Sequence, residues 1–237
     1  MAAPFLTAEW KNLVMANYII DPQLLLPYLP SKTELDYYNG NTYVSLVGFQ
    51  FYNTRIRGVK IPFHVNFIEV NLRFYVRYMD RNEWKRGTVF ISEIVPRVAI
   101  TFVANNIYHE KYRTMKMDHY LSRDNEIMAA RYRWKYRNKW NDLSVTADTN
   151  ADDITVGSEE EFITEHYWGY SKQQNNVTIQ YQVAHPRWKI YPVRDFSINA
   201  NFRDLYGHEF AFLDTATPSS VLFARGSEIT VFKKALL

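Results

Sequence analysis

The sequence contains no cysteine and little glycine, and both absences narrow the chemistry that the chain can perform. Without cysteine there can be no disulfide, no thiolate metal site and no thiol nucleophile. Only 8 glycines are present, and no G-x-x-x-x-G-K-[S/T], G-x-G-x-x-G or G-x-S-x-G pattern occurs. A phosphate-binding loop, a dinucleotide site and a serine hydrolase of the usual kind are therefore not expected.

Long apolar runs and an export signal are also missing. The longest apolar stretches are far shorter than a membrane span, and the first ten residues lack the basic region and apolar run of a signal peptide. We therefore expect a cytoplasmic protein without membrane contact, which the lack of cysteine fits. The net charge is only +3, which permits an anionic ligand and does not require a nucleic acid.

Aromatic residues are abundant, with 18 Tyr, 15 Phe and 6 Trp among 237 residues. A chain of this size with 47% hydrophobic residues can bury a sizeable core, and Tyr and Trp also suit the walls of a pocket. There is no repeat or low-complexity tract. Residues 146–158 are typical of an exposed connection, but both flanks are aromatic and strand-like, so we expect one domain over residues 1–237.

Alternation with a period of two dominates the chain and predicts many strands. These cover residues 10–20, 43–52, 66–78, 88–95, 113–121, 126–140, 142–148, 165–170, 177–184, 190–198, 220–223 and 228–233. The segment 43–52 is apolar on both faces, which indicates a doubly buried central strand. Helices are predicted at residues 23–28 after Asp21 and Pro22, at 97–112, at 158–164 and at 199–206. Many strands with few helices indicate a mainly β fold, a barrel or a sandwich with attached helices.

The predicted strand at residues 66–78 separates its side chains cleanly. Apolar residues face one way, and the other face carries Glu69, Asn71, Arg73, Tyr75 and Arg77. This polar face is either an ordinary solvent face or the lining of a polar pocket. In the second case Glu69 and Arg73, roughly 13 Å apart along a strand, would hold opposite ends of a small ligand.

Glu93 shares a face of its predicted strand with Val89, Ile91 and Val95. A carboxylate on an apolar face is salt-bridged, neutral or functional, and Arg97 is its nearest candidate partner in the sequence. One interpretation is therefore a structural pair of Glu93 and Arg97. The other is a desolvated carboxylate with a raised pKa, which suits a general acid or base near neutral pH.

The six histidines are scattered, and no pair has the H-E-x-x-H spacing of a zinc helix. We therefore predict no metal site, and we expect no cofactor. His166 and His185 lie in the aromatic, strand-like segments EHYWGY and AHPRW, from which they could reach a pocket as proton donors.

The most basic stretch, residues 131–140, alternates cations with aromatic residues. Binding of a single-stranded nucleic acid requires both kinds on one surface, whereas a period of two places them on opposite faces of a strand. We therefore expect a wet basic face over a buried aromatic one, and no nucleic-acid partner.

Several sequence blocks, in this order along nearly the whole chain, carry a resemblance to a known family. They are NYIIDPQLLLPYLP at residues 17–30, YVSLVGFQF at 43–51, IPFHVNFIEVNLRFYV at 61–76, RGTVFISEIVPR at 86–97 and VANNIYHEKY at 103–112, followed by EHYWGY and AHPRW. In their order and spacing these blocks resemble the YqjF-like family of uncharacterised conserved proteins.

That family is in turn similar to acetoacetate decarboxylase-like proteins. The resemblance implies a closed, cone-shaped antiparallel β-barrel with a few flanking helices and an internal cavity. In the decarboxylases a lysine after a proline forms a Schiff base with a β-keto acid, whereas here Arg97 follows Pro96. Arginine stays protonated and is a poor nucleophile, and Lys85 and Lys111 lie outside the motif. The resemblance also matches Glu69 to a pocket glutamate of the decarboxylases.

The residue patterns and the family resemblance together predict a protein that binds a small organic acid or carbonyl compound in an internal cavity, without Schiff-base chemistry. Whether it is an enzyme is left open, with Glu69 and Glu93 as the candidate acid and base. The candidate ligand-binding residues are Arg73, Arg97, Asn71, Tyr75 and His64. The alternatives are a decarboxylase-like enzyme with a relocated lysine and a non-catalytic interaction protein. A homo-oligomer is compatible with each of these.

Overall fold

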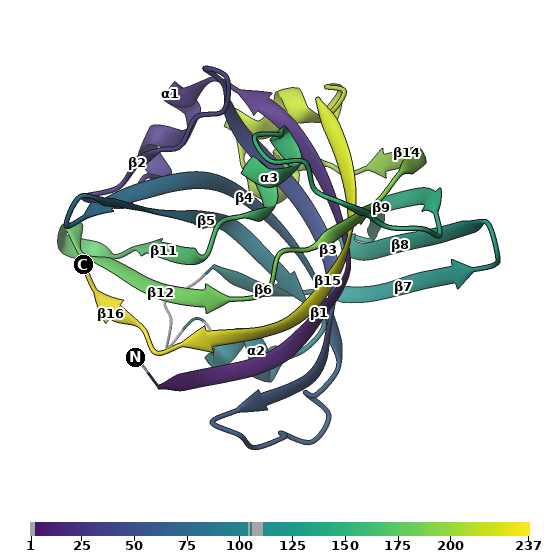
Figure 1. Ribbon diagram of the computed structural model, residues 1–237, viewed down its shortest axis with the longest axis horizontal. Coiled ribbons are helices and arrows are strands. Elements are labelled where there is room, and N and C mark those ends of the chain that lie inside the picture. Colours follow the sequence, from purple (N-terminus) through teal and green to yellow (C-terminus); the bar gives the residue numbers. More distant parts are fainter. Residues whose placement is uncertain (1–2, 104, 106–110) are drawn as a thin grey trace.

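The computed structural model describes residues 3–103, 105 and 111–237, and its strands form two sheets (Figure 1). The larger sheet contains β1 (Pro4–Ile20), β2 (Glu34–Leu35), β3 (Thr42–Ile56), β4 (Phe67–Asp80), β5 (Glu83–Val95), β6 (Tyr112–Thr114), β10 (Asp152–Asp153), β11 (Trp168–Lys172), β12 (Thr178–Ala184), β13 (Lys189–Tyr191), β15 (Ser220–Phe232) and β16 (Ala235–Leu236). The smaller sheet contains β7 (Lys116–Arg123), β8 (Ile127–Tyr136), β9 (Lys139–Asp148) and β14 (Val193–Asn199). The helices are α1 (Pro22–Leu25), α2 (Val98–Val103), α3 (Glu159–Thr164) and α4 (Phe202–Tyr206), with the 3₁₀ helices η1 (Leu26–Tyr28), η3 (Gln174–Asn176) and η4 (His208–Asp214). The prediction of a mainly β chain with few helices is confirmed.

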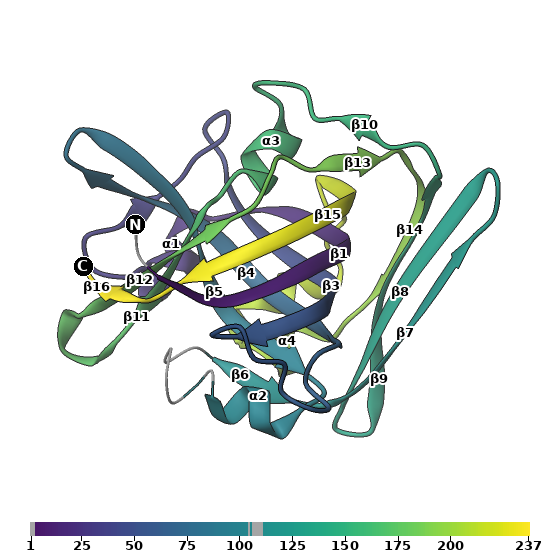
Figure 2. The same ribbon diagram turned by 60° about the horizontal axis from the view of Figure 1, so that its bottom comes forward.

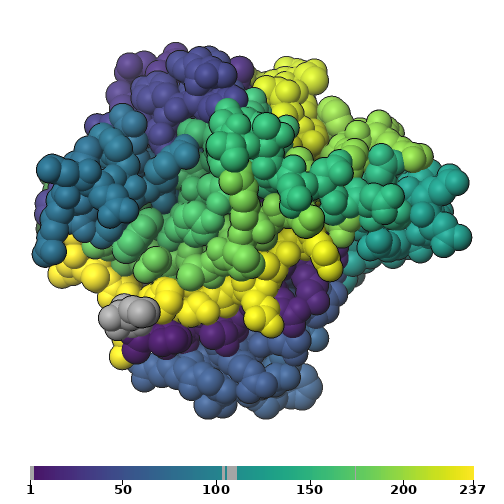
Figure 3. Space-filling model, viewed as in Figure 1, coloured from purple at the N-terminus to yellow at the C-terminus, as the bar shows by residue number. Residues whose placement is uncertain are grey.

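Seven strands of the larger sheet close into a barrel. Hydrogen-bonded neighbours follow the order β15, β1, β3, β4, β5, β11 and β12, and β12 pairs with β15 again. The neighbours are antiparallel except for β5 and β11, which are parallel. In the space-filling view β12, β15 and β1 form adjacent green, yellow and purple bands (Figure 3). The predicted closed barrel is therefore confirmed, with one parallel pair in an otherwise antiparallel ring.

The parallel pair requires two backbones to approach closely. Trp168 lies opposite Gly87, and a Cβ atom on Gly87 would lie 2.4 Å from the Trp168 carbonyl oxygen. Only glycine fits at this position, because any side chain would collide with the main chain of β11. Closure of the barrel along β5 and β11 thus depends on a residue without a side chain.

The smaller sheet covers one side of the barrel as a second layer (Figure 2). Tyr132 and Trp134 of β8 are fully buried, in one apolar cluster with Leu46 of the barrel. Arg133 faces the other way and forms an ion pair with Asp118 at 2.6 Å. This arrangement confirms the predicted basic face over a buried aromatic one within β8. The prediction is wrong for Trp140, because the turn between β8 and β9 places it opposite Lys135, with its ring 4.9 Å from Arg133 Cζ on the basic face.

β3 and β4 are buried on both faces, because the wall of the barrel lies between two apolar clusters. Val44 and Leu46 of β3 pack in the cluster that includes the smaller sheet, whereas Val47 and Phe49 pack in the cluster inside the barrel. The prediction of a doubly buried strand at residues 43–52 is confirmed. On β4 the residues that pack outward are the predicted apolar set, namely Ile68, Val70, Leu72, Phe74 and Val76.

Side-chain caps begin two of the short helices at the predicted positions. Asp21 accepts a hydrogen bond from the backbone nitrogen of Gln23 at 2.9 Å, at the start of α1. Ser158 accepts one from the backbone nitrogen of Glu161 at 3.2 Å, at the start of α3. These bonds satisfy amide groups that have no partner within the first turn of a helix.

The helix predicted at residues 97–112 is only partly correct. α2 covers Val98–Val103, but Tyr112 begins strand β6, which pairs with β5. Residues 104 and 106–110, which the prediction also included, lie outside the described residues. None of the helices in the described part of the chain has the length and apolar character needed to span a membrane.

Candidate functional site

A cavity of about 620 Å³ lies inside the barrel. Its polar lining comes mainly from β4 and β5, and much of the remaining wall is aromatic. The aromatic lining residues include Trp10, Phe49, Phe51, Phe67, Phe90 and Trp188. Three exposed lining residues, Arg57, Ile61 and Ala99, mark the mouth between the β3–β4 connection and α2. A cavity of this size and lining suits a small-molecule ligand with a polar and an apolar part.

Glu69, Asn71 and Arg73 project from β4 into the cavity and are 2%, 1% and 8% exposed. The sequence therefore predicted the two faces of β4 correctly, and the alternative of an ordinary solvent face is wrong. Tyr75 shares this face but is not a lining residue. Its hydroxyl forms a hydrogen bond with Ser45 Oγ at 2.7 Å inside the wall.

Glu93 also lines the cavity, although its predicted face was wrong. Asn71 lies opposite Glu93, and Arg73 lies opposite Phe90. Between these two pairs β4 advances by two residues but β5 by three, so β5 contains one extra residue. The extra residue, Ile91, is a β-bulge, and it reverses the face to which the following residues point. Glu93 therefore leaves the apolar face of Ile91 and is buried in the cavity wall.

Glu69 is held in the wall by two hydrogen bonds. Asn71 Nδ2 donates to Oε1 at 2.9 Å, and the Tyr112 hydroxyl donates to Oε2 at 3.0 Å. Burial raises the pKa of Glu69 to about 7, against the opposing effects of these hydrogen bonds and of the Arg73 charge. Both protonation states of Glu69 are therefore populated near neutral pH, which suits a group that exchanges a proton with a ligand.

Arg73 is a buried cation without an ion pair. No carboxylate of the described residues pairs with its guanidinium, and its Nε has no hydrogen-bond partner among them. Its remaining contacts are weak: Nη2 lies 3.8 Å from Met15 Sδ, and Cζ lies 5.7 Å from the centroid of the Tyr75 ring. Because an unpaired buried charge is destabilising, an arginine of this kind in a cavity wall is typical of an anion-binding site.

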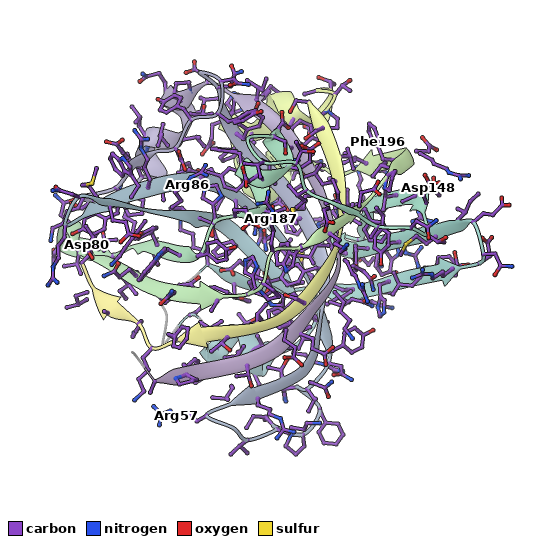
Figure 4. All side chains as sticks on the ribbon, in the orientation of Figure 1. Arg57, Asp80, Arg86, Asp148, Arg187 and Phe196 are labelled. Atoms are coloured by element: carbon purple, nitrogen blue, oxygen red, sulfur yellow. The ribbon has the colours of Figure 1, made fainter. Side chains whose placement is uncertain are left out.

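His166 lines the cavity from the connection between α3 and β11. Its Nε2 lies 3.2 Å from Asp36 Oδ2, which also accepts a hydrogen bond from Arg86 Nε at 2.6 Å. Burial lowers the pKa of His166 to about 4, outweighing the hydrogen bond to Asp36, so the imidazole is neutral near pH 7. Figure 4 shows Arg86 near α3 and Arg57 at the lower end of the molecule, so the Asp36 network lies away from the mouth.

The other predicted residues occupy different positions. Arg97 is exposed just before α2 and does not line the cavity, so the structure does not bring it together with Arg73. His64 lines the cavity, and its Nδ1 lies 2.7 Å from the Pro62 carbonyl oxygen. His185 also lines the cavity, with its ring stacked on Trp188 at a centroid distance of 4.3 Å.

No lysine lines the cavity, and every lysine of the chain is among the described residues. Lys85 pairs with Asp80 and lies 4.4 Å from the centroid of the Trp168 ring, whereas Lys111 lies 4.9 Å from that of Tyr28. In the part of the chain that the structure describes, no three His, Asp or Glu side chains gather as metal ligands.

The sequence reasoning missed three residues of this region. Tyr112 fell inside a predicted helix, although it binds Glu69 from strand β6. Phe90 lines the cavity opposite Arg73, although the sequence reasoning did not single it out. Asp36 is 130 residues from His166 in the sequence, and no local pattern links the two.

Comparison with solved structures confirms the predicted acetoacetate decarboxylase-like fold. Acetoacetate decarboxylase from Legionella pneumophila is similar with a TM-score of 0.66 and 14% identity, over 100% of this chain and 88% of that chain. The enduracididine biosynthesis enzyme MppR, complexed with pyruvate, has a TM-score of 0.67 and 12% identity, over 100% and 91%. An acetoacetate decarboxylase-like enzyme from Sphingomonas wittichii RW1 has a TM-score of 0.61 and 11% identity, over 99% and 94%. At these identities the similarity shows the fold alone.

Sequence comparison gives the family. The chain is 33% identical over 104 residues to the uncharacterized protein YqjF of Bacillus subtilis (strain 168), a match that spans 44% of this chain and 41% of YqjF. The family model DUF2071, described as an uncharacterized conserved protein, matches residues 7–228. The predicted resemblance to YqjF-like proteins is therefore confirmed. This chain belongs to the DUF2071 family of uncharacterized conserved proteins.

Proposed function

We propose that this chain binds a small organic acid in the barrel cavity, with the ligand carboxylate on Arg73 and the rest of the ligand against the aromatic wall. The observation that carries the proposal is the buried Arg73 guanidinium, which lines the cavity without an ion pair to any described carboxylate. A bound carboxylate would supply the missing counter-charge through charge-assisted hydrogen bonds. The planar guanidinium suits a carboxylate, because its N–H groups can donate to both oxygens at once.

Glu69 supports a proton-transfer role at the same site. It lines the cavity with Arg73 but is engaged by Asn71 and Tyr112, so it does not neutralise the arginine directly. With its pKa raised by burial to about 7, Glu69 can release or accept a proton in the range where a general acid or base is most effective. The ligand would then be an acid that gains or loses a proton near Glu69 while Arg73 holds its carboxylate.

The proposal uses no amine chemistry. One structural relative is complexed with pyruvate, a small keto acid, which supports small acids as the ligand class. In this chain no lysine lines the cavity to form a Schiff base with such a ligand. Treatment with pyruvate or acetoacetate and borohydride should therefore leave every lysine unmodified. A trapped adduct on Lys85 or Lys111, found by peptide mass spectrometry, would instead support the alternative of a relocated catalytic lysine.

The direct test compares acids with their own primary amides in a thermal shift experiment. The acids would be 3-phenylpropionate, 4-methyl-2-oxopentanoate and acetoacetate, each beside its amide at the same concentration. A ligand that binds only the native state raises the melting temperature, so we expect a rise with one or more acids and none with the amides. An equal rise with acid and amide would contradict the role of Arg73. A flat response to all acids would refute the proposal and favour the interaction-protein alternative.

A further inference from the structure

His166 lines the cavity and carries a ring nitrogen that no described residue engages. Asp36, held by Arg86, is a carboxylate that can only accept hydrogen bonds, so the 3.2 Å contact requires the proton on His166 Nε2. In a neutral imidazole the other nitrogen, Nδ1, then carries a lone pair. Nδ1 is buried and has no hydrogen-bond partner among the described residues. A buried acceptor without a donor is destabilising, and in a cavity wall it indicates a ligand group that donates.

The imidazole of His166 lies in the same part of the cavity wall as Arg73. Both side chains lie against the ring of Tyr75, whose centroid is 4.7 Å from that of the His166 ring and 5.7 Å from Arg73 Cζ. Phe162 packs edge-on against the imidazole at 5.3 Å. Because these rings and the bond to Asp36 hold the imidazole, Nδ1 cannot turn away without breaking a contact. A ligand carboxylate on Arg73 would therefore lie beside an imidazole of fixed orientation.

We infer that His166 is a second ligand contact, and that its Nδ1 accepts a hydrogen bond from a hydroxyl group of the acid bound by Arg73. The inference rests on the proposed function and narrows its ligand class to hydroxy acids with an apolar body. A keto group is itself an acceptor and would face the Nδ1 lone pair unfavourably. An ammonium group would lie close to the Arg73 guanidinium and be repelled. Asp36 and Arg86 act as positioning residues, because they fix the proton on Nε2.

Titration calorimetry at pH 7.5 with three matched acids tests the inference. The probes are 3-phenylpropionate, 2-hydroxy-3-phenylpropionate and 3-hydroxy-3-phenylpropionate, which differ only in the hydroxyl. We expect the wild type to bind one of the hydroxy acids on the order of tenfold more tightly than the parent acid. The parent acid leaves a buried acceptor without a donor, and this weakens binding by about that factor. The readout is this affinity ratio, not the affinity itself.

Three variants assign the ratio to His166 Nδ1. In His166→Gln the side-chain amide can still reach Asp36 but offers no acceptor at the Nδ1 position, so the ratio should fall to about one. In His166→Asn the amide oxygen lies near the former Nδ1 position, so the affinity ratio should lie between those of His166→Gln and the wild type. His119→Gln is the matched control, because His119 is exposed on β7 and does not line the cavity, and it should keep the wild-type ratio.

Each unfavourable result has a distinct meaning. Equal wild-type affinity for the parent and both hydroxy acids would overturn the inference and leave the proposed function intact. A hydroxyl preference that survives in His166→Gln would also overturn it, and would point to Asn71 Oδ1, another buried acceptor without a partner among the described residues. If the wild type binds none of the three acids, the proposed function itself fails.

Discussion

Replacing Arg73 by Met should make the free protein more stable while removing acid binding. Arg73 is 8% exposed, has no ion pair with the described carboxylates and leaves its Nε without a partner. Methionine has a similar unbranched shape and removes the charge. An isolated buried polar group is destabilising by about 1–3 kcal/mol, and well-packed apolar replacements of buried charges are often stabilising by about 1–4 kcal/mol.

Two interactions of the Arg73 charge reduce this gain in stability. The cation–π contact with Tyr75, at 5.7 Å, is worth about 0.5–1 kcal/mol. The positive charge also favours the ionised form of Glu69, but at pH 6 that group is mostly neutral because burial raises its pKa to about 7. We therefore expect the free energy of unfolding to rise by about 1–2 kcal/mol, and the melting temperature by about 2–4 °C per kcal/mol for a chain of this length.

Urea unfolding at pH 6 and calorimetric titration with the acid found in the thermal shift panel measure the two effects. Loss of charged hydrogen bonds, worth about 1.5–3 kcal/mol, should weaken binding roughly 10- to 150-fold. Arg77→Met is the matched control: Arg77 lies on the same strand, pairs with Glu34 at 2.5 Å near the surface and does not line the cavity. It should change stability by less than about 1 kcal/mol and leave binding unchanged. An Arg73→Met protein that is less stable than the wild type, or that still binds the acid, would refute the reasoning.

Three further changes test the cavity wall and the barrel seam. Because burial raises the pKa of Glu69 from 4.5 to about 7, the native protein holds a proton between these pH values that the unfolded chain has released. The free energy of unfolding of the wild type should therefore fall by roughly 3 kcal/mol relative to that of Glu69→Gln as the pH rises from 4.5 to 7. Urea titrations measure this difference, and parallel pH curves for the two proteins would contradict it. Tyr112→Phe removes a hydrogen bond to the ionised form of Glu69, so NMR titration should find the pKa of this carboxyl above the wild-type value, whereas an unchanged or lower value counts against the contact. Gly87→Ala places a Cβ atom 2.4 Å from the Trp168 carbonyl oxygen and should lower the free energy of unfolding by about 1–3 kcal/mol; a neutral effect would show that the β5–β11 seam is not tightly packed.

The local part of the site could be predicted from the sequence. The alternation along β4 is a property of one extended segment, and it placed Glu69, Asn71 and Arg73 on a common face that the structure confirms. Composition and pattern alone did not decide whether that face meets solvent or a cavity. The decision depends on β11 and β12, which complete the ring far along the chain.

The remaining errors have specific physical causes. A single extra residue, Ile91, changes the phase of β5, so the face predicted for Glu93 was wrong. Glu93 is nevertheless buried, as one of its two interpretations required. Arg97 was grouped with the cavity because it follows Glu93 closely, but the chain leaves the barrel before it. His166 was noticed as a histidine in an aromatic segment, whereas its neutral state depends on burial by distant segments and on a partner 130 residues away.

The double burial of β4 has a consequence for anyone who would alter the ligand of this protein. Within residues 68–76 the even positions carry the packing against the outer layer, and the odd positions face the interior. A combinatorial library for new ligand specificity should therefore vary only the odd-numbered residues of this segment. On β5 the rule changes at the bulge, where the cavity positions pass from the even residues Thr88 and Phe90 to the odd residue Glu93. A library that ignores this change of parity would randomise core residues instead of ligand contacts.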